Sequence, residues 1–206
     1  MLVHCFTRRA TLVLSLVVMV GSLAICHSGA AQSPAAKFAN DGNLIRPEGY
    51  REWILVGTPL TPNDMNNGKA PFPEFHHVYI DPGSWQHYKK TGKFRDGAML
   101  VKELISVGSK AAVSGSGYFM GEFIGLEATV KDAKRFPKEP GNWAYFSFTG
   151  GGSPMMNPEG KHDGSLKDQA PAFPTAACAA CHAAAAAEDM VFSQYYPVLR
   201  AAKPKK

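Results

Sequence analysis

Three runs in the middle of the chain decide the fold: AMLVKELISV at residues 98–107, YFMGEFIGLEATV at 118–130 and WAYFSFT at 143–149. Each run is rich in β-branched and aromatic residues and is bounded by Gly, Pro or charged residues, which predicts a strand. Gly121 and Gly125 predict a kink in the second strand. The first run is apolar on both of its alternating faces, so we expect it to be buried on both sides. The middle of the chain is therefore predicted to be β-rich.

Shorter elements flank these three strands. Toward the N-terminus, the sequence predicts a strand or helix edge at 50–57, turns at 58–59 and 66–68, and a strand at 77–80. A helix is predicted next, which Ser84 caps and which runs through Lys90 and ends at Gly92. Toward the C-terminus it predicts a loop over 150–174, helix-favouring residues at 183–187 and a helix at 189–196 that Pro197 interrupts. A loop of this length is typically functional or mobile.

The N-terminus has the pattern of an export signal. Arg8 and Arg9 precede an apolar run at 11–25, and small residues follow through Ala31. This order predicts a cleaved signal peptide over 1–31 and a mature protein in the periplasm. A membrane anchor is the alternative, but the run is shorter than the roughly 20 residues that span a bilayer.

The composition predicts that residues 32–206 form one ordinary globular domain. The chain is 45% apolar, 19% charged and 11% aromatic, with a net charge of +5. Loss of Arg8 and Arg9 with the leader would reduce the net charge to about +3. The tail at 203–206 is expected to be disordered. Because no basic face is evident, nucleic acid is not an expected partner.

The cysteines point to a haem. Cys178 and Cys181 are the only cysteines after the leader, and His182 follows them, giving C-A-A-C-H. This spacing is the signature of c-type haem attachment, in which two thiols bond the haem and the histidine binds its iron. A thioredoxin-like redox pair would need a surrounding βαβ pattern, and a zinc site would need a second ligand pair. We therefore expect one covalently bound haem c, carried by a C-terminal helical segment after a β-rich domain. Small helical cytochromes c instead carry this motif near the N-terminus.

Lys102 is unusual within its strand. It shares a face with Leu100 and Leu104, in a strand that is apolar on both sides. A lysine in such a place usually extends its amine to water at a sheet edge. The other interpretation is a lysine held against an apolar body such as the porphyrin, where partial desolvation lowers the pKa of the amine and makes it nucleophilic. The residues alone leave both interpretations open, and they select no sixth ligand for the iron.

Taken together, these motifs resemble the cytochrome P-460 family, which includes hydroxylamine-oxidising cytochromes P-460 and gas-binding cytochromes c′-β. The matching stretches cover nearly the whole mature chain: YREW (50–53), NNGKAPF (66–72), VYIDP (78–82), KTGKFRDG (90–97), VKEL (101–104), GYFMG (117–121), PGNWA (140–144), CAACH (178–182), DMVF (189–192) and YPVLRAA (196–202). The resemblance implies an α+β fold, mainly antiparallel β-sheet with a few helices, usually as a homodimer. It also implies an open iron site opposite His182.

The resemblance further implies a function. In the P-460 members a lysine in the V-K-E-L context is bonded to a meso carbon of the porphyrin, and Lys102 occupies that position. The implied reaction is oxidation of hydroxylamine to nitrous oxide, with a small soluble electron acceptor such as another cytochrome c. Such oxidation needs a proton acceptor near the iron.

The chain departs from the family pattern at the expected distal residues. Ala177 stands where a distal glutamate is expected, and His76 stands in place of an arginine. Candidate proton acceptors are then Glu74 and Glu122, while Phe72 and Phe75 are candidates either to cap the iron or to pack in the core. Lys102 favours a hydroxylamine-oxidising enzyme, and Ala177 favours a non-catalytic protein that binds nitric oxide or a similar gas. An electron-transfer cytochrome is a more distant alternative.

Overall fold

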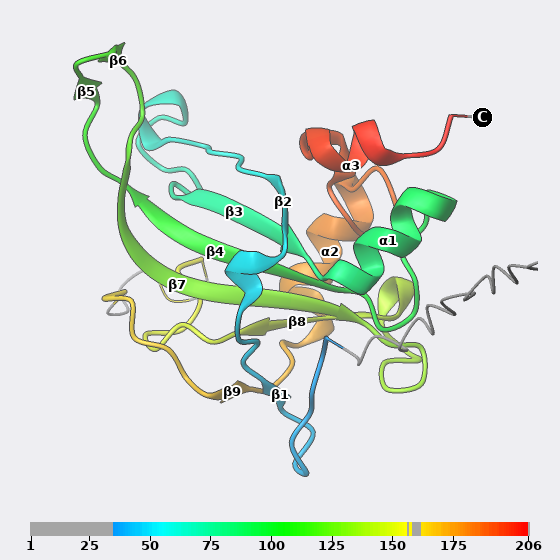
Figure 1. Ribbon diagram of the computed structural model, residues 1–206. Helices are drawn as coiled ribbons and strands as arrows, with labels where there is room; N and C mark the ends of the chain where they lie inside the picture. Colours follow the sequence, from blue (N-terminus) through cyan, green and yellow to red (C-terminus); the bar gives the residue numbers. More distant parts are fainter. Residues whose placement is uncertain (1–34, 156, 158–161, 206) are drawn as a thin grey trace, which may run out of the picture. The chain divides into compact units, whose positions relative to one another are not determined.

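Five antiparallel strands form the central sheet of the computed structural model, which describes residues 35–155, 157 and 162–205 (Figure 1). The strands lie side by side in the order β2 (Ile54–Gly57), β3 (Phe75–Ile80), β4 (Met99–Val107), β7 (Met120–Lys131) and β8 (Trp143–Ser147). The predicted signal peptide at 1–31 lies outside the described residues. The expected α+β fold with a mainly antiparallel sheet is confirmed.

Small ribbons and helices complete the fold. The ribbons pair β1 (Leu44–Ile45) with β9 (Gln169–Ala170), and β5 (Ala111–Ala112) with β6 (Gly115–Ser116). The α-helices are α1 (Pro82–Thr91), α2 (Thr175–Ala185) and α3 (Pro197–Ala202). Four 3₁₀ turns are also present among the described residues: η1 (Tyr50–Glu52), η2 (Asn63–Met65), η3 (Pro140–Asn142) and η4 (Ser193–Tyr195). Within the part of the chain that the structure describes, no helix has the length and apolar character needed to cross a bilayer.

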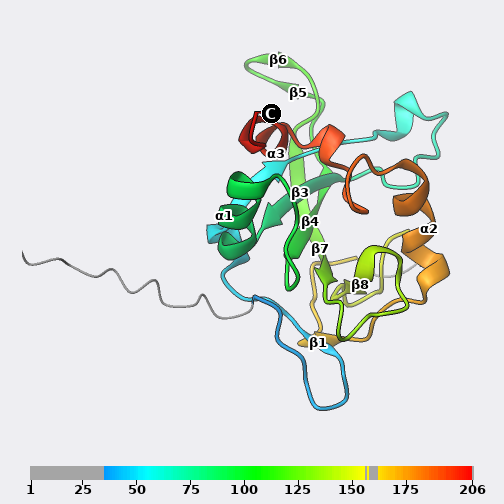
Figure 2. The same ribbon diagram turned by 90° about the vertical axis from the view of Figure 1, so that its right-hand side faces the viewer.

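The sheet buries side chains on both of its faces, as the β4 sequence predicts. On one face, which we call the helix face, Leu100 packs with Tyr88 of α1 and Leu199 of α3. On the opposite face, which we call the ribbon face, Val101 belongs to the cluster that holds Leu44 of β1. Figure 2 shows α1 and α3 to the left of these strands and α2 to their right. Successive β4 residues therefore point into different environments.

Helix α1 begins earlier than expected. The Asp81 carboxylate accepts a hydrogen bond from the Ser84 N–H at 2.8 Å, so Asp81 and not Ser84 caps the helix. Pro82 takes the first helical position, where its fixed φ and missing N–H have no cost. The expected end is confirmed, because Gly92 closes the helix with a φ of 67°.

The C-terminal region differs from the expected helix at 189–196. Asp189 and Met190 have φ values of 44° and 64°, so the chain turns through left-handed conformations and cannot continue a helix there. Pro197 begins α3 instead of interrupting a helix. The segment 150–174, expected to be a loop, contributes β9 to the β1 ribbon.

Irregular pairing between β4 and β7 matches the predicted kink. The register shifts between the pairs Leu104–Gly125 and Ile105–Phe123, and shifts again toward Met120. Each shift places an extra β7 residue opposite β4, as in a β-bulge, which bends and twists the strand. The two irregular points adjoin Gly121 and Gly125.

Candidate functional site

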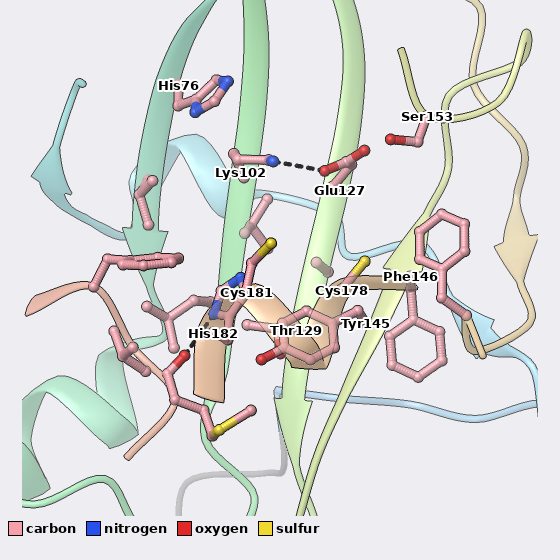
Figure 3. A pocket seen from close by; sticks show the side chains of 18 of the residues that line it. His76, Lys102, Glu127, Thr129, Tyr145, Phe146, Ser153, Cys178, Cys181 and His182 are labelled. Carbon is pink, nitrogen blue, oxygen red and sulfur yellow. Dashed lines mark hydrogen bonds and ion pairs between the residues drawn. The ribbon is translucent and has the colours of Figure 1, made fainter. Parts of the chain in front are cut away.

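A cavity of about 290 Å³ lies where the helix face of the sheet meets α2. Its walls are mostly apolar and aromatic, with a few polar groups, which is the usual make-up of a cofactor or ligand site. Figure 3 shows His76, Lys102 and Glu127 on neighbouring strands, with Cys178, Cys181 and His182 of α2 facing the same space. Residues far apart in the sequence therefore meet at one site.

Helix α2 presents the whole C-x-x-C-H motif to this cavity. Cys178, Cys181 and His182 stand at helical spacings of three and four residues, so they share one helix face. Both thiols are free. Burial, assisted by the Glu127 carboxylate, raises the pKa of Cys178 to about 11. A reactive redox pair needs a lowered thiol pKa, so the raised pKa of Cys178 is evidence against a thioredoxin-like role.

The His182 ring is held with one nitrogen available. Its Nδ1–H donates a hydrogen bond to the Met190 carbonyl at 2.6 Å, which leaves Nε2 without that hydrogen and able to bind iron. The rings of Tyr145 and Phe192 pack on it, each with its centroid 4.6 Å away. Burial, together with the nearby Lys102 charge, lowers the pKa of His182. The ring is therefore neutral at neutral pH, as a metal ligand must be.

The left-handed turn at Asp189 and Met190 supplies the acceptor for His182. Lys131 Nζ contacts both carboxylate oxygens of Asp189 at 2.9 Å. Trp143 Nε1–H donates to the same carboxylate at 3.3 Å. These contacts from β7 and β8 fix a backbone conformation that is unfavourable for residues other than glycine. They hold the Met190 carbonyl in place beside the His182 ring.

Lys102 reaches into the cavity from β4. Its Nζ lies 2.7 Å from Oε2 of Glu127, which stands directly opposite on β7. The same nitrogen lies 4.7 Å from the centroid of the Phe72 ring, a cation–π contact. The Lys102 side chain is 25% exposed and the Glu127 side chain 14%. Within the cavity, the Lys102 ammonium therefore contacts both the Glu127 carboxylate and the Phe72 ring.

Glu127 is the site residue that sequence reasoning missed. Burial raises the pKa of its carboxyl, but the Lys102 ammonium, assisted by Ser153 and His76, outweighs this effect, so the pKa lies below its ordinary value of 4.5. Its Oε1 is buried without a hydrogen-bond partner among the described residues, and so is the hydroxyl of Tyr145. Both side chains line the cavity. Buried polar atoms are normally satisfied, so these two indicate a ligand or water in this space.

The other predicted residues divide between two places. Phe72, His76 and Ala177 line the cavity with Lys102. The Phe72 and His76 rings meet edge to face, with centroids 5.4 Å apart. Glu74 does not line this cavity, but its Oε1 lies 3.3 Å from Nε2 of His76.

Phe75 and Glu122 are not among the residues around this space. Strand alternation places Phe75 on the ribbon face, opposite Ile105. Glu122 is exposed on β7.

The residues present fit a haem c. Cys178 and Cys181 offer free thiols, and His182 offers a neutral imidazole nitrogen from the same helix face. The mainly apolar walls suit a porphyrin, and the unpaired atoms of Glu127 and Tyr145 lie where a further group would sit.

Comparison with known proteins identifies the same class. The family model described as Cytochrome P460 matches residues 47–193, which include every cavity residue named above. No protein in a search of curated proteins matches the chain. The match spans most of the chain and ends beyond the haem-binding motif. The chain therefore belongs to the cytochrome P460 family and is a c-type haem cytochrome of that type.

Proposed function

We propose that this protein is a periplasmic enzyme that oxidises hydroxylamine to nitrous oxide. Cys178 and Cys181 would attach one haem c, His182 would bind its iron, and Lys102 would form a third bond to the porphyrin. One observation carries the proposal: Lys102 Nζ lies inside the cavity that the C-x-x-C-H motif faces. A lysine with no role at the haem would be expected to reach water instead.

The haem, when bound, supplies a redox-active iron with a position open to a small nitrogen compound. The overall reaction converts two hydroxylamine molecules into one nitrous oxide and one water, and releases four protons and four electrons. The electrons would pass to a small soluble acceptor such as another cytochrome c. The protons need an acceptor within hydrogen-bond reach of the substrate or one water away.

Glu127 is the proton acceptor that we propose. Its carboxylate lines the cavity, and Oε1 is unpaired among the described residues. A bond from Lys102 to the porphyrin would remove the ammonium that now lowers the pKa of Glu127. Burial would then be opposed only by Ser153 and His76 and would raise that pKa, which makes the carboxylate a stronger base. Glu127 would thus supply the group that Ala177 does not.

The reaction that would form the bond between Lys102 and the porphyrin must balance in atoms and electrons. Lys102 Nζ would replace the hydrogen of a porphyrin meso carbon. One hydrogen leaves the amine and one leaves the carbon, as two protons and two electrons. Hydrogen peroxide is a suitable acceptor, because two protons and two electrons reduce it to two waters. Glu127, 2.7 Å from Nζ, is placed to take the proton that frees the amine lone pair.

The alternative is a non-catalytic protein that binds nitric oxide. It is favoured by Ala177, which brings no carboxylate to the cavity from α2. If the ion pair of Lys102 with Glu127 persisted in the mature protein, Glu127 would remain a fixed counter-ion and would be a poor base. In either case we expect a homodimer, as the family resemblance implies.

Turnover of the haem-loaded protein separates the two functions. With an artificial oxidant, the enzyme should consume hydroxylamine and release nitrous oxide, measured by gas chromatography. A gas-binding protein should bind nitric oxide, seen as a change in the optical spectrum, without producing nitrous oxide. Absence of nitrous oxide under conditions in which nitric oxide binds would refute the enzyme proposal.

A further inference from the structure

A second cavity, of about 380 Å³, lies beside β4 and β7 and shares no lining residue with the first. Its wall includes Glu74 together with Asp64 and Lys110, which form an ion pair. The side chains of Asp64 and Lys110 are 44% and 62% exposed, so this cavity has a hydrated rim. The first cavity, in contrast, is where the protons of the proposed reaction would be released.

A side-chain contact joins the two cavities. His76 lines the first cavity and Glu74 lines the second, and His76 Nε2 lies 3.3 Å from Oε1 of Glu74. Glu74 immediately precedes β3, and His76 is the second residue of that strand, so the two side chains lie close together. The exposed fraction is 15% for the His76 side chain and 3% for that of Glu74. The contact is therefore well shielded from bulk water.

Glu74 is a buried carboxylate that contacts His76 and also lines the second cavity. Among the described residues, His76 provides the hydrogen bond and ion-pair contact that its side chain makes. The position of Glu74 between an imidazole and a hydrated cavity suits a group that exchanges protons.

His76 is held in a form that can pass protons on. Burial is the main cause that lowers the pKa of His76; the Lys102 charge lowers it further as long as the amine is not bonded to the porphyrin, and Glu74 and Glu127 act in the opposite direction. The ring is therefore mainly neutral at neutral pH, with one nitrogen that donates and one that accepts. The edge-to-face contact with Phe72 restrains the ring orientation.

We propose that His76 and Glu74 form a proton relay from the cavity at Lys102 and Glu127 to the second cavity. A proton taken up at the free nitrogen of His76 lets Nε2 give its own proton to Oε1 of Glu74. Glu74 then releases that proton to water in the second cavity, and the imidazole returns to its first tautomer. No electron moves through the relay; the electrons leave from the haem to the soluble acceptor. The inference rests on the proposed function, which releases the protons.

The first test compares Glu74→Gln with Glu48→Gln, a control at an exposed position outside both cavities. Glu74→Gln keeps the size of the side chain but cannot accept a proton, so hydroxylamine turnover should fall by about 10²-fold. The solvent deuterium isotope effect on turnover should increase. Added formate should restore part of the rate, because a small acid can enter the second cavity. Glu74→Asp should retain more activity than Glu74→Gln.

Turnover equal to wild type in Glu74→Gln would overturn the relay and leave the proposed function standing. A fall in turnover without formate rescue and without a larger isotope effect would also overturn it, because a merely structural role predicts that result. Thermal unfolding and the optical spectrum of each variant establish that the haem protein is folded.

The second test needs no turnover. Redox-difference infrared spectra of the haem protein should contain a carboxyl band that is absent in Glu74→Gln and present in Glu48→Gln. If wild type fails to oxidise hydroxylamine, the proposed function fails, yet the band would still support proton exchange at Glu74. Spectra of wild type and Glu74→Gln that are identical in the carboxyl region would overturn the relay.

Discussion

Lys102 and Glu103 are neighbours on β4, but their charges lie in very different surroundings. On the ribbon face, the buried Glu103 carboxylate accepts hydrogen bonds from the Tyr50 hydroxyl at 2.9 Å and from Arg51 Nε at 2.8 Å. Its other oxygen lies 3.4 Å from the Tyr79 hydroxyl. On the helix face, Lys102 lies in a cavity, and its partner Glu127 keeps one oxygen unpaired among the described residues.

The difference separates a structural charge from a functional one. A buried charge whose hydrogen bonds are all made by the protein stabilises the fold and needs nothing more. A buried ion pair with an unpaired atom beside a cavity has capacity for another partner. By this criterion Glu103 stabilises β4. Lys102 and Glu127 have the capacity to bind a further group. The following changes should affect one face and not the other.

The largest effect is expected at the haem-binding motif on the helix face. The double variant Cys178→Ala with Cys181→Ala lacks both thiols, so no thioether bond to a haem can form. Acid–acetone treatment should extract all colour from the variant and none from wild type. Mass spectrometry of wild type should show one added haem. Extraction of the colour from wild type would show that the haem is not bound covalently.

The next largest effect is expected for Glu127→Gln. Loss of a proton acceptor in the cavity should lower hydroxylamine turnover by about 10²–10⁴-fold. Binding of nitric oxide should be nearly unchanged, because that step needs no base. Conversely, Ala177→Glu should raise turnover in the Glu127→Gln background if a carboxylate from α2 can replace it. Turnover that is insensitive to Glu127→Gln would place the proton acceptor elsewhere.

On the ribbon face, Glu103→Ala should affect stability and not chemistry. It leaves the buried Tyr50 hydroxyl and the Arg51 guanidinium without their acceptor, so the free energy of unfolding should decrease by about 3 kcal/mol. The measurement is denaturant unfolding of the haem protein. The optical spectrum and the nitric oxide affinity should match wild type below the transition. A shifted spectrum would break the separation between the two faces of β4.

A smaller effect is expected from Asp189→Ala, which frees the turn behind His182. Loss of the partly exposed ion pair with Lys131 should cost about 1 kcal/mol of unfolding free energy. Because the Met190 carbonyl is then less well fixed, the His182 ring should gain freedom, visible as a broadened ferric spectrum. Unchanged stability together with an unchanged spectrum would show that the turn does not depend on Asp189.

The helix-face site was only partly predictable from the sequence. The haem motif occupies five consecutive residues, and helical spacing alone brings Cys178 and His182 to one face. Lys102 stands out in the sequence because strand alternation places its charge among apolar residues. Glu127 lies in an equally apolar run, yet its partner depends on the register between β4 and β7. The bulges near Gly121 and Gly125 shift that register, and they cannot be located by counting residues.

The fold was predicted best where the signals are local. The three central strands and the glycine that ends α1 follow from composition and turn chemistry. Errors arose where two local signals compete: Asp81 and Ser84 can both cap a helix, and Pro197 can either break a helix or begin one. Tertiary contacts, such as those that fix the left-handed turn at Asp189, decide between such signals.

The central claim is that Lys102 bonds to the haem, and the optical spectrum of the ferrous protein tests it most directly. The cross-link should shift the ferrous Soret band far to the red of an ordinary cytochrome c, and Lys102→Ala should return it to the ordinary position. Proteolysis and mass spectrometry should find a peptide containing Lys102 joined to the haem peptide at 178–182. An ordinary c-type spectrum that is the same in wild type and Lys102→Ala would contradict the claim and leave the gas-binding function.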